Sequence, residues 1–160
     1  LVRRNSRYAN RLAFEITESS ELSNIEATNR VLQELRELGH EICLDDFGAG
    51  FASFQYLHGL HVDWVKFDGR YIRSVLEVPR DRVLLKAMAN LCRELQIRTV
   101  GEQVETESQA GLLTDLGVGY AQGWLFGKPA LEPRLPQAET PREPARPVNV
   151  RRQGTRDSWG

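Results

Sequence analysis

The sequence predicts an α/β fold with a parallel sheet, and three observations support this prediction. Short apolar runs alternate along the chain with segments of helical periodicity, which is the pattern of right-handed βαβ units. Five of these runs are typical of strands: residues 12–16, 41–45, 62–67, 97–101 and 118–122. Polar residues close each run, as they do where βα barrels and open sheets carry their sites. This pattern leaves the choice between a barrel and an open sheet undecided.

Four helices are expected between these strands. Ser23 and Glu26 have the spacing of a capping box, and Gly39 stands where a helix C-terminal cap belongs. These signals predict the first helix. Residues 51–60 are rich in aromatic side chains and predict a short helix, and residues 106–116 predict the last one.

Residues 81–95 predict the remaining helix through an amphipathic pattern. Apolar residues recur there at spacings of three and four, so they form one stripe along a helix. We expect this stripe to face the core; it contains Leu84, Met88, Leu91 and Leu95, widened by Ala87 and Cys92. Cys92 and Cys43 show no metal-ligand spacing, so we expect small buried hydrophobic residues in a reducing compartment.

Composition places the chain among ordinary globular proteins. Its 160 residues are 41% hydrophobic and 27% charged, which suffices for one domain with a core. The net charge of −1 gives no support for binding a nucleic acid polymer. No apolar run approaches the roughly 18 residues of a membrane span, and the start shows no signal-peptide pattern. We expect a cytoplasmic chain, although the parent protein could be membrane-anchored. Because the sequence begins at Leu1 and not at Met, we also expect it to be a piece of a longer protein.

The last thirty residues differ in character from the rest. From Leu131 onward large apolar residues nearly vanish, and five prolines interrupt any helix or ladder. Six arginines stand there against four acidic residues. Such a segment buries too little surface to offset its ordering entropy, so residues 131–160 are expected to be a disordered, solvated tail.

The stretch from Cys43 to Gly50, CLDDFGAG, carries the main chemical signal. Successive side chains of a strand point to opposite faces, so Asp45 and Asp46 can reach one site only if the strand ends and the chain turns. Gly48 and Gly50 supply the backbone freedom for that turn. Two carboxylates there suit a hard cation such as Mg²⁺ or Mn²⁺. The alternative is an Asp-rich turn that only makes local hydrogen bonds.

The other strands favour the functional interpretation. One acid after a strand is commonly a helix cap, but capping does not explain polar groups at five strand ends in succession. Because the carboxyl ends of parallel strands meet at one rim, these groups should lie together; they are Glu15, Asp45, Asp46, Lys66, Glu102 and Gln122.

Five motifs, in order and at compatible spacings, resemble those of EAL domains. They are FEITES (14–19), DDFGAG (45–50), KFD (66–68), EQVE (102–105) and YAQG (120–123). The family comprises bacterial phosphodiesterases that linearise cyclic di-GMP to pGpG, and inactive relatives that only bind it. The resemblance runs from about residue 12 to about residue 130.

The resemblance implies a TIM-type barrel with one strand reversed and a site on its C-terminal rim. This chain supplies five strands, whereas a closed barrel needs about eight. The family's Glu-Ala-Leu motif and an Asn metal ligand belong to earlier strands that this sequence lacks. Residues 1–130 are therefore expected to be the C-terminal part of an EAL domain, inactive alone, with exposed sheet edges.

The resemblance also assigns metal ligands. Glu15 and Asp45 would bind one metal ion, and Asp46 would bind or bridge to a second. Glu102 would help to bind the second ion or act as a base. Two Mg²⁺ or Mn²⁺ ions at such a site would offset the charge of a phosphodiester and activate water.

Four other assignments complete the implied site. Lys66 would hold the attacking water or a phosphate oxygen, Glu105 would support Glu102, and Gln122 would position a ligand or water. Glu18 would brace the loop from Gly48 to Phe54, which the family uses for metal binding and dimer contacts. The implied partners are therefore cyclic di-GMP and a second copy of the chain, bound through the loop after Asp46.

Two alternatives stay open at this point. A degenerate receptor would bind the dinucleotide without cleaving it, but such relatives typically lose ligating acids that are present here. Another βα-barrel enzyme could use the lysine and acids on magnesium, for example to abstract a proton.

Two residues depart from the motifs of the EAL family. Ala49 stands where the family usually has Thr and Gln103 where it usually has Gly, and both departures look tolerable.

Overall fold

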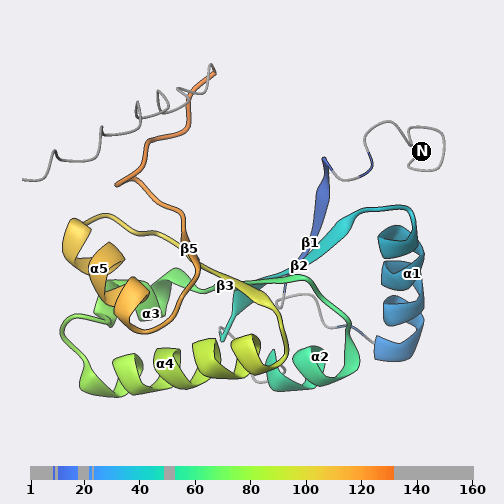
Figure 1. Cartoon of the computed structure of the whole chain (residues 1–160), viewed down its shortest axis with the longest axis horizontal. Helices are drawn as coiled ribbons and strands as arrows, with labels where there is room; N and C mark the ends of the chain where they lie inside the picture. The colour runs from blue at the N-terminus through green and yellow to red at the C-terminus, as the bar shows by residue number, and fades with distance from the viewer. Residues whose placement is uncertain (1–8, 10, 18–21, 23, 49–52, 132–160) are drawn as a thin grey trace, which may run out of the picture. The chain divides into compact units, whose positions relative to one another are not determined.

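Five parallel strands form one sheet in chain order (Figure 1). The computed structural model describes residues 9, 11–17, 22, 24–48 and 53–131. The strands are β1 (Ala13–Thr17), β2 (Glu41–Phe47), β3 (Trp64–Phe67), β4 (Arg98–Gly101) and β5 (Tyr120–Ala121). Each pairs in parallel with the next, so the sheet order is β1-β2-β3-β4-β5. The predicted α/β fold with five parallel strands is confirmed.

Five helices connect and follow these strands. They are α1 (Ile25–Glu37), α2 (Ser53–Gly59), α3 (Gly69–Ser74), α4 (Pro79–Glu94) and α5 (Glu107–Asp115). The four expected helices are present, and α3 is additional. Six residues with one fully buried apolar side chain, Ile72, are too few to show helical periodicity in a sequence.

The two faces of the sheet differ in chemistry. Ile42, Leu44, Val65 and Phe67 are completely buried and belong to a core that also contains residues of the helices, including Leu85, Cys92 and Leu113. The residues that alternate with them point to the opposite face; they include Glu41, Cys43 and Asp45 of β2 and Trp64 and Lys66 of β3. Asp45 and Lys66 thus lie on the face opposite to the one that packs into the core.

The stripe expected to bury α4 is confirmed at Met88 and Cys92, but the buried face is otherwise rotated about the helix axis. The buried residues are Leu85, Met88, Ala89 and Cys92, whereas Leu84 and Leu95 are 41% and 50% exposed. Consecutive apolar residues such as Val83, Leu84 and Leu85 allow two neighbouring stripes, and packing against the sheet selects between them.

Helix ends agree with the sequence signals in part. The N-cap of α1 is Asn24, whose side chain accepts a hydrogen bond from the backbone N–H of Ala27 at 2.8 Å. The expected cap, Ser23, lies outside the described residues. Gly39 ends this helix with a φ of 86°, a conformation that glycine adopts without steric cost.

The described sheet has two open edges. β1 and β5 each pair with one described neighbour. The chain separates into units of residues 1–128 and 129–160, and most of the second unit, 132–160, lies outside the described residues. The disordered tail stays a prediction. None of the helices that the structure describes is long and apolar enough to cross a membrane.

Candidate metal centre

An irregularity near the end of β2 brings two adjacent carboxylates to one side of the sheet. Asp46 has a φ of 56°, and the pairing of β2 with β3 shifts register between Leu44 and Phe47. The backbone N–H of Asp46 donates to Asp45 Oδ1 at 3.1 Å. The sequence predicted a turn at Gly48 and Gly50, and the irregularity at Asp46, inside β2, comes in addition to it. Gly48 also has a positive φ, 94°, and Gly50 lies outside the described residues.

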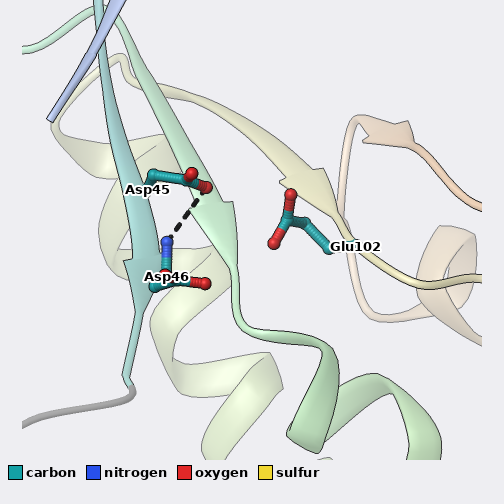
Figure 2. Close-up of side chains that lie close together, drawn as sticks. All are labelled: Asp45, Asp46 and Glu102. Atoms are coloured by element: carbon teal, nitrogen blue, oxygen red, sulfur yellow. Dashed lines mark hydrogen bonds between the residues drawn. The ribbon is translucent and has the colours of Figure 1, made fainter. Parts of the chain in front are cut away.

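Lys66 forms ion pairs with acids from the ends of three other strands. Its Nζ lies 2.7 Å from Glu102 Oε1, 3.0 Å from Asp45 Oδ1 and 3.4 Å from Glu15 Oε1. The lysine side chain is only 11% exposed, so burial would be costly without these partners. We call Glu15, Asp45, Asp46 and Glu102 the carboxylate cluster. Figure 2 shows how three of its members face one another.

The carboxylate cluster carries more negative charge than Lys66 can balance. Four carboxylates stand against one ammonium, a formal charge of −3 when all are ionised. Burial lowers the pKa of Lys66, but the hydrogen bonds to Glu102 and Asp45 and the negative charges of these two acids together raise that pKa above its ordinary value.

The pKa of Glu102 reflects the same excess of negative charge. Burial raises the pKa of Glu102, and Lys66 lowers it through a hydrogen bond and its charge. The carboxylates of Asp45 and Asp46 raise it again, so the net direction is upward. A further cation would therefore be accommodated favourably among these groups.

The donor atoms suit a hard divalent cation. Asp45, Asp46 and Glu102 each offer a carboxylate oxygen, and these oxygens lie within 4.8 Å of one another. Oxygen donors are the ligands that Mg²⁺ and Mn²⁺ prefer. These residues therefore fit such an ion, both because their net charge is negative and because their donor atoms are oxygens.

The remaining predicted site residues are placed differently. Gln122 follows β5, and its backbone N–H donates to Gly101 O at 2.8 Å, which fixes it at the same rim. Glu105 is exposed, and its backbone N–H donates to Gln109 Oε1 at 2.9 Å at the start of α5. Among the described residues, the group of carboxylates close enough to share one metal ion contains Asp45, Asp46 and Glu102 and does not include Glu105, whose support of Glu102 stays a prediction. Glu18 lies outside the described residues.

Residues of α3 near the cluster were missed by sequence reasoning. Tyr71 Oη donates to Gly48 O at 3.2 Å, and Arg73 donates to Gln103 Oε1. The one available signal was Asp68, an N-cap residue directly after a strand, which accepts from Arg70 N at 2.6 Å.

Comparison with known proteins identifies relatives of one kind. The EAL domain family model matches residues 1–129. The cyclic di-GMP phosphodiesterase PdeB of Shewanella oneidensis is 40% identical over 118 residues, covering 74% of this chain and 14% of the relative. The cyclic di-GMP phosphodiesterase PdeF of Escherichia coli is 39% identical over 118 residues, covering 74% and 16%.

Solved structures show the same fold. The PaMucR phosphodiesterase in complex with c-di-GMP has a TM-score of 0.72 and 35% identity, covering 80% of this chain and 52% of that one. The manganese and cy-diGMP complex of Klebsiella pneumoniae BlrP1 has a TM-score of 0.71 and 28% identity, covering 76% and 31%. The chain thus spans a small part of both curated relatives and about half of the PaMucR structure.

The five ordered motifs, the parallel sheet and the family match over residues 1–129 agree with one another. This chain belongs to the EAL-domain family.

Proposed function

We propose that this chain is the C-terminal part of a metal-dependent phosphodiesterase domain that hydrolyses cyclic di-GMP to linear pGpG. The observation that supports it most is the excess of negative charge around Lys66, at the carboxyl ends of neighbouring strands of an EAL-family chain. A receptor that only binds the dinucleotide would have no need to keep four acids at this rim.

The carboxylate cluster would hold two divalent ions, Mg²⁺ or Mn²⁺. Such ions offset the charge of a phosphodiester and lower the pKa of a water molecule, which makes water a competent nucleophile near neutral pH. The chain's own contribution is the placement of Glu15, Asp45, Asp46 and Glu102 as anionic oxygen donors at one rim.

Lys66 would orient the reacting groups. An ammonium can donate three hydrogen bonds. In this structure, the Nζ of Lys66 lies among the carboxylates of Glu15, Asp45 and Glu102. With a cation bound among these acids, Lys66 would have an N–H left to donate a hydrogen bond to a phosphate oxygen or to the attacking water. Gln122 would position ligand or water, and Glu105 and Glu18 would support Glu102 and the loop after Asp46. We propose that this loop also forms the homodimer contact.

A chimera tests the proposal without depending on what precedes this chain. Residues 12–129 replace the corresponding segment of the EAL region of Shewanella PdeB, and hydrolysis of cyclic di-GMP is followed by chromatography of pGpG. We expect turnover with Mg²⁺ or Mn²⁺, and losses of roughly a hundredfold or more for Asp45→Asn and Glu15→Gln, because even outer-shell changes at metal sites cost about 10–100-fold.

Glu37→Gln is the matched control, because Glu37 is an exposed acid at the end of α1 and should leave turnover unchanged. Robust turnover in excess chelator would contradict the metal assignment. Tight binding of cyclic di-GMP without cleavage would favour the receptor instead.

A further inference from the structure

The helix α3 contacts the chain on both sides of the carboxylate cluster. On the β2 side, Tyr71 Oη and Arg70 Nη2 both donate to the carbonyl oxygen of Gly48, at 3.2 and 3.4 Å. Gly48 has a φ of 94°, and a Cβ placed on it would lie 2.7 Å from Tyr71 Cε2. The ring of Tyr71 therefore lies directly on this backbone, two residues beyond Asp46.

On the β4 side, the contact runs through Gln103, the residue after Glu102. Gln103 has a φ of 56°, a conformation that a side chain with a Cβ adopts only at a cost in energy. Its side chain lies over the backbone of Gly69, where any Cβ would overlap it. Arg73 donates a hydrogen bond to its Oε1. This turn thus directs Gln103 onto both ends of α3.

α3 is itself held firmly enough to connect the two sides. Asp68 caps it through Arg70 N at 2.6 Å, and the backbone N–H of Asp68 donates to Phe47 O at 3.2 Å. Ile72 is completely buried, and its carbonyl accepts from the buried Gln109 Nε2 at 3.3 Å. The helix is anchored in the core, at β2 and at α5.

Anchoring α3 to both strands would oppose the repulsion between the carboxylates of the cluster. Asp46 lies near the end of β2 and Glu102 directly follows β4; these two strands are separated by β3 and do not pair with each other. Their carboxylates repel each other when few cations are near, and β3 contributes only Lys66 between them. An element that fixes the ends of both strands would keep the donor oxygens within reach of one ion.

We propose that α3 is a brace that sets the separation between Asp46 and Glu102, with Tyr71 and Gln103 as positioning residues for metal binding. This inference rests on the proposed function, because it takes the carboxylate cluster to be a metal site. Tyr71 fixes the β2 end through Gly48, and Gln103 fixes the β4 end through Gly69 and Arg73. Both residues would act through the backbone beside the carboxylates and not as metal ligands.

The first readout needs no metal. Hydrogen exchange, followed by mass spectrometry, is compared in peptides spanning residues 44–48 and 102–105 of the 160-residue chain. Tyr71→Phe keeps the ring and removes the hydroxyl, so we expect several-fold faster exchange in the first peptide. Arg73→Ala removes the donor to Gln103, so we expect faster exchange in the second. Unchanged exchange in both peptides would overturn the brace.

The second readout is Mn²⁺ affinity of the same chain, measured by electron paramagnetic resonance of the free ion. Both variants should bind about tenfold more weakly, the size of effect that residues orienting metal ligands have. Arg73→Lys keeps a cationic donor and should recover part of the affinity. The controls are Tyr120→Phe and Arg80→Ala, which remove the same groups from exposed positions on β5 and α4.

The two proposals fail in different ways. If neither the wild-type chain nor the PdeB chimera binds Mn²⁺, the proposed function is contradicted, and hydrogen exchange still decides whether α3 acts as a brace. The other case is a wild-type chain that binds Mn²⁺. If the variants Tyr71→Phe and Arg73→Ala then bind Mn²⁺ as tightly as the two control variants, the brace is overturned and the metal site stands.

Discussion

At the scale of single residues, Lys66 decides the charge balance of the carboxylate cluster. Its Nζ is within 3.4 Å of three acids, and we infer that it orients the nucleophile or a phosphate oxygen. In the PdeB chimera, Lys66→Ala should lower kcat by roughly a hundredfold, as loss of one aimed donor does, and should change cyclic di-GMP affinity much less. Lys86→Ala on exposed α4 is the control. Equal losses in kcat and affinity would assign Lys66 to substrate binding.

Gln96 offers a residue-scale test of stability. It follows α4 with a φ of 60°, and its backbone N–H donates to Arg93 O at 3.0 Å, so it occupies the left-handed cap position that Gly39 and Gly117 occupy elsewhere. The left-handed conformation costs a non-glycine residue about 1–2 kcal/mol, and glycine's extra freedom in the unfolded chain offsets about 0.5–1 of that.

Gln96→Gly should therefore raise the free energy of unfolding by roughly 0.5–1 kcal/mol in urea denaturation. Gln33→Gly, inside α1, is the matched control and should lower that free energy by about 0.5–1 kcal/mol. A loss of stability in Gln96→Gly would show that the conformation is not strained.

Residue positions at strand ends were predictable, whereas local backbone turns were not. Asp45, Lys66 and Glu102 could be placed at one rim because each follows or closes an apolar run. The turn at Gly48 was predicted, but the irregularity at Asp46 was not, because glycine is the strong signal for positive φ and Asp adopts it less often. The substitution of Gln103 for the usual Gly looked neutral in the sequence, yet its φ of 56° and its contact with Arg73 give it a structural consequence.

At the scale of elements, a second polar network links the opposite ends of β2, β3 and β4. Trp64 Nε1 donates to Glu41 Oε2 at 2.6 Å, and Arg98 Nη2 donates to Glu41 Oε1 at 2.5 Å. Arg98 also lies over the Trp64 ring at 3.9 Å. The hydrogen bonds from Arg98 and Trp64 hold the pKa of Glu41 below its ordinary value of 4.5.

This lowered pKa gives a pH dependence of known sign. A carboxyl group with a depressed pKa in the folded state stabilises the fold above its unfolded pKa. That stability is lost as pH falls through the folded pKa. We expect Glu41→Gln to reduce the free energy of unfolding at pH 7, with the difference from wild type shrinking below about pH 4.5. Glu37→Gln should show no such trend, and a difference that grows toward acid pH would contradict the network.

Elements were predicted well where their patterns were long. The five strands and four helices follow from alternation and periodicity, but α3 has too few residues for a periodic signal. The buried face of α4 was predicted correctly at Met88 and Cys92 but not at Leu84, because Val83, Leu84 and Leu85 are consecutive apolar residues and only contact with the sheet decides which is buried.

At the scale of the whole molecule, the described sheet leaves β1 and β5 as edge strands. Unpaired edges and exposed apolar side chains promote association, and Trp124 and Phe126 are each 61% exposed. We expect purified residues 1–160 to form dimers or larger assemblies in size-exclusion chromatography with light scattering, and to hydrolyse no cyclic di-GMP alone. A monodisperse monomer with cooperative melting and real turnover would contradict this expectation.

The metal site itself is tested most directly by titrating Mn²⁺ into the 160-residue chain and measuring the free ion by electron paramagnetic resonance. The wild-type chain should bind Mn²⁺, and Asp45→Asn combined with Asp46→Asn should weaken binding by roughly a hundredfold or more, because two charged oxygen donors are removed from the carboxylate cluster. Glu37→Gln should bind as the wild type does. Equal Mn²⁺ binding by the wild type and the double variant would contradict the assignment of the carboxylate cluster as the metal centre.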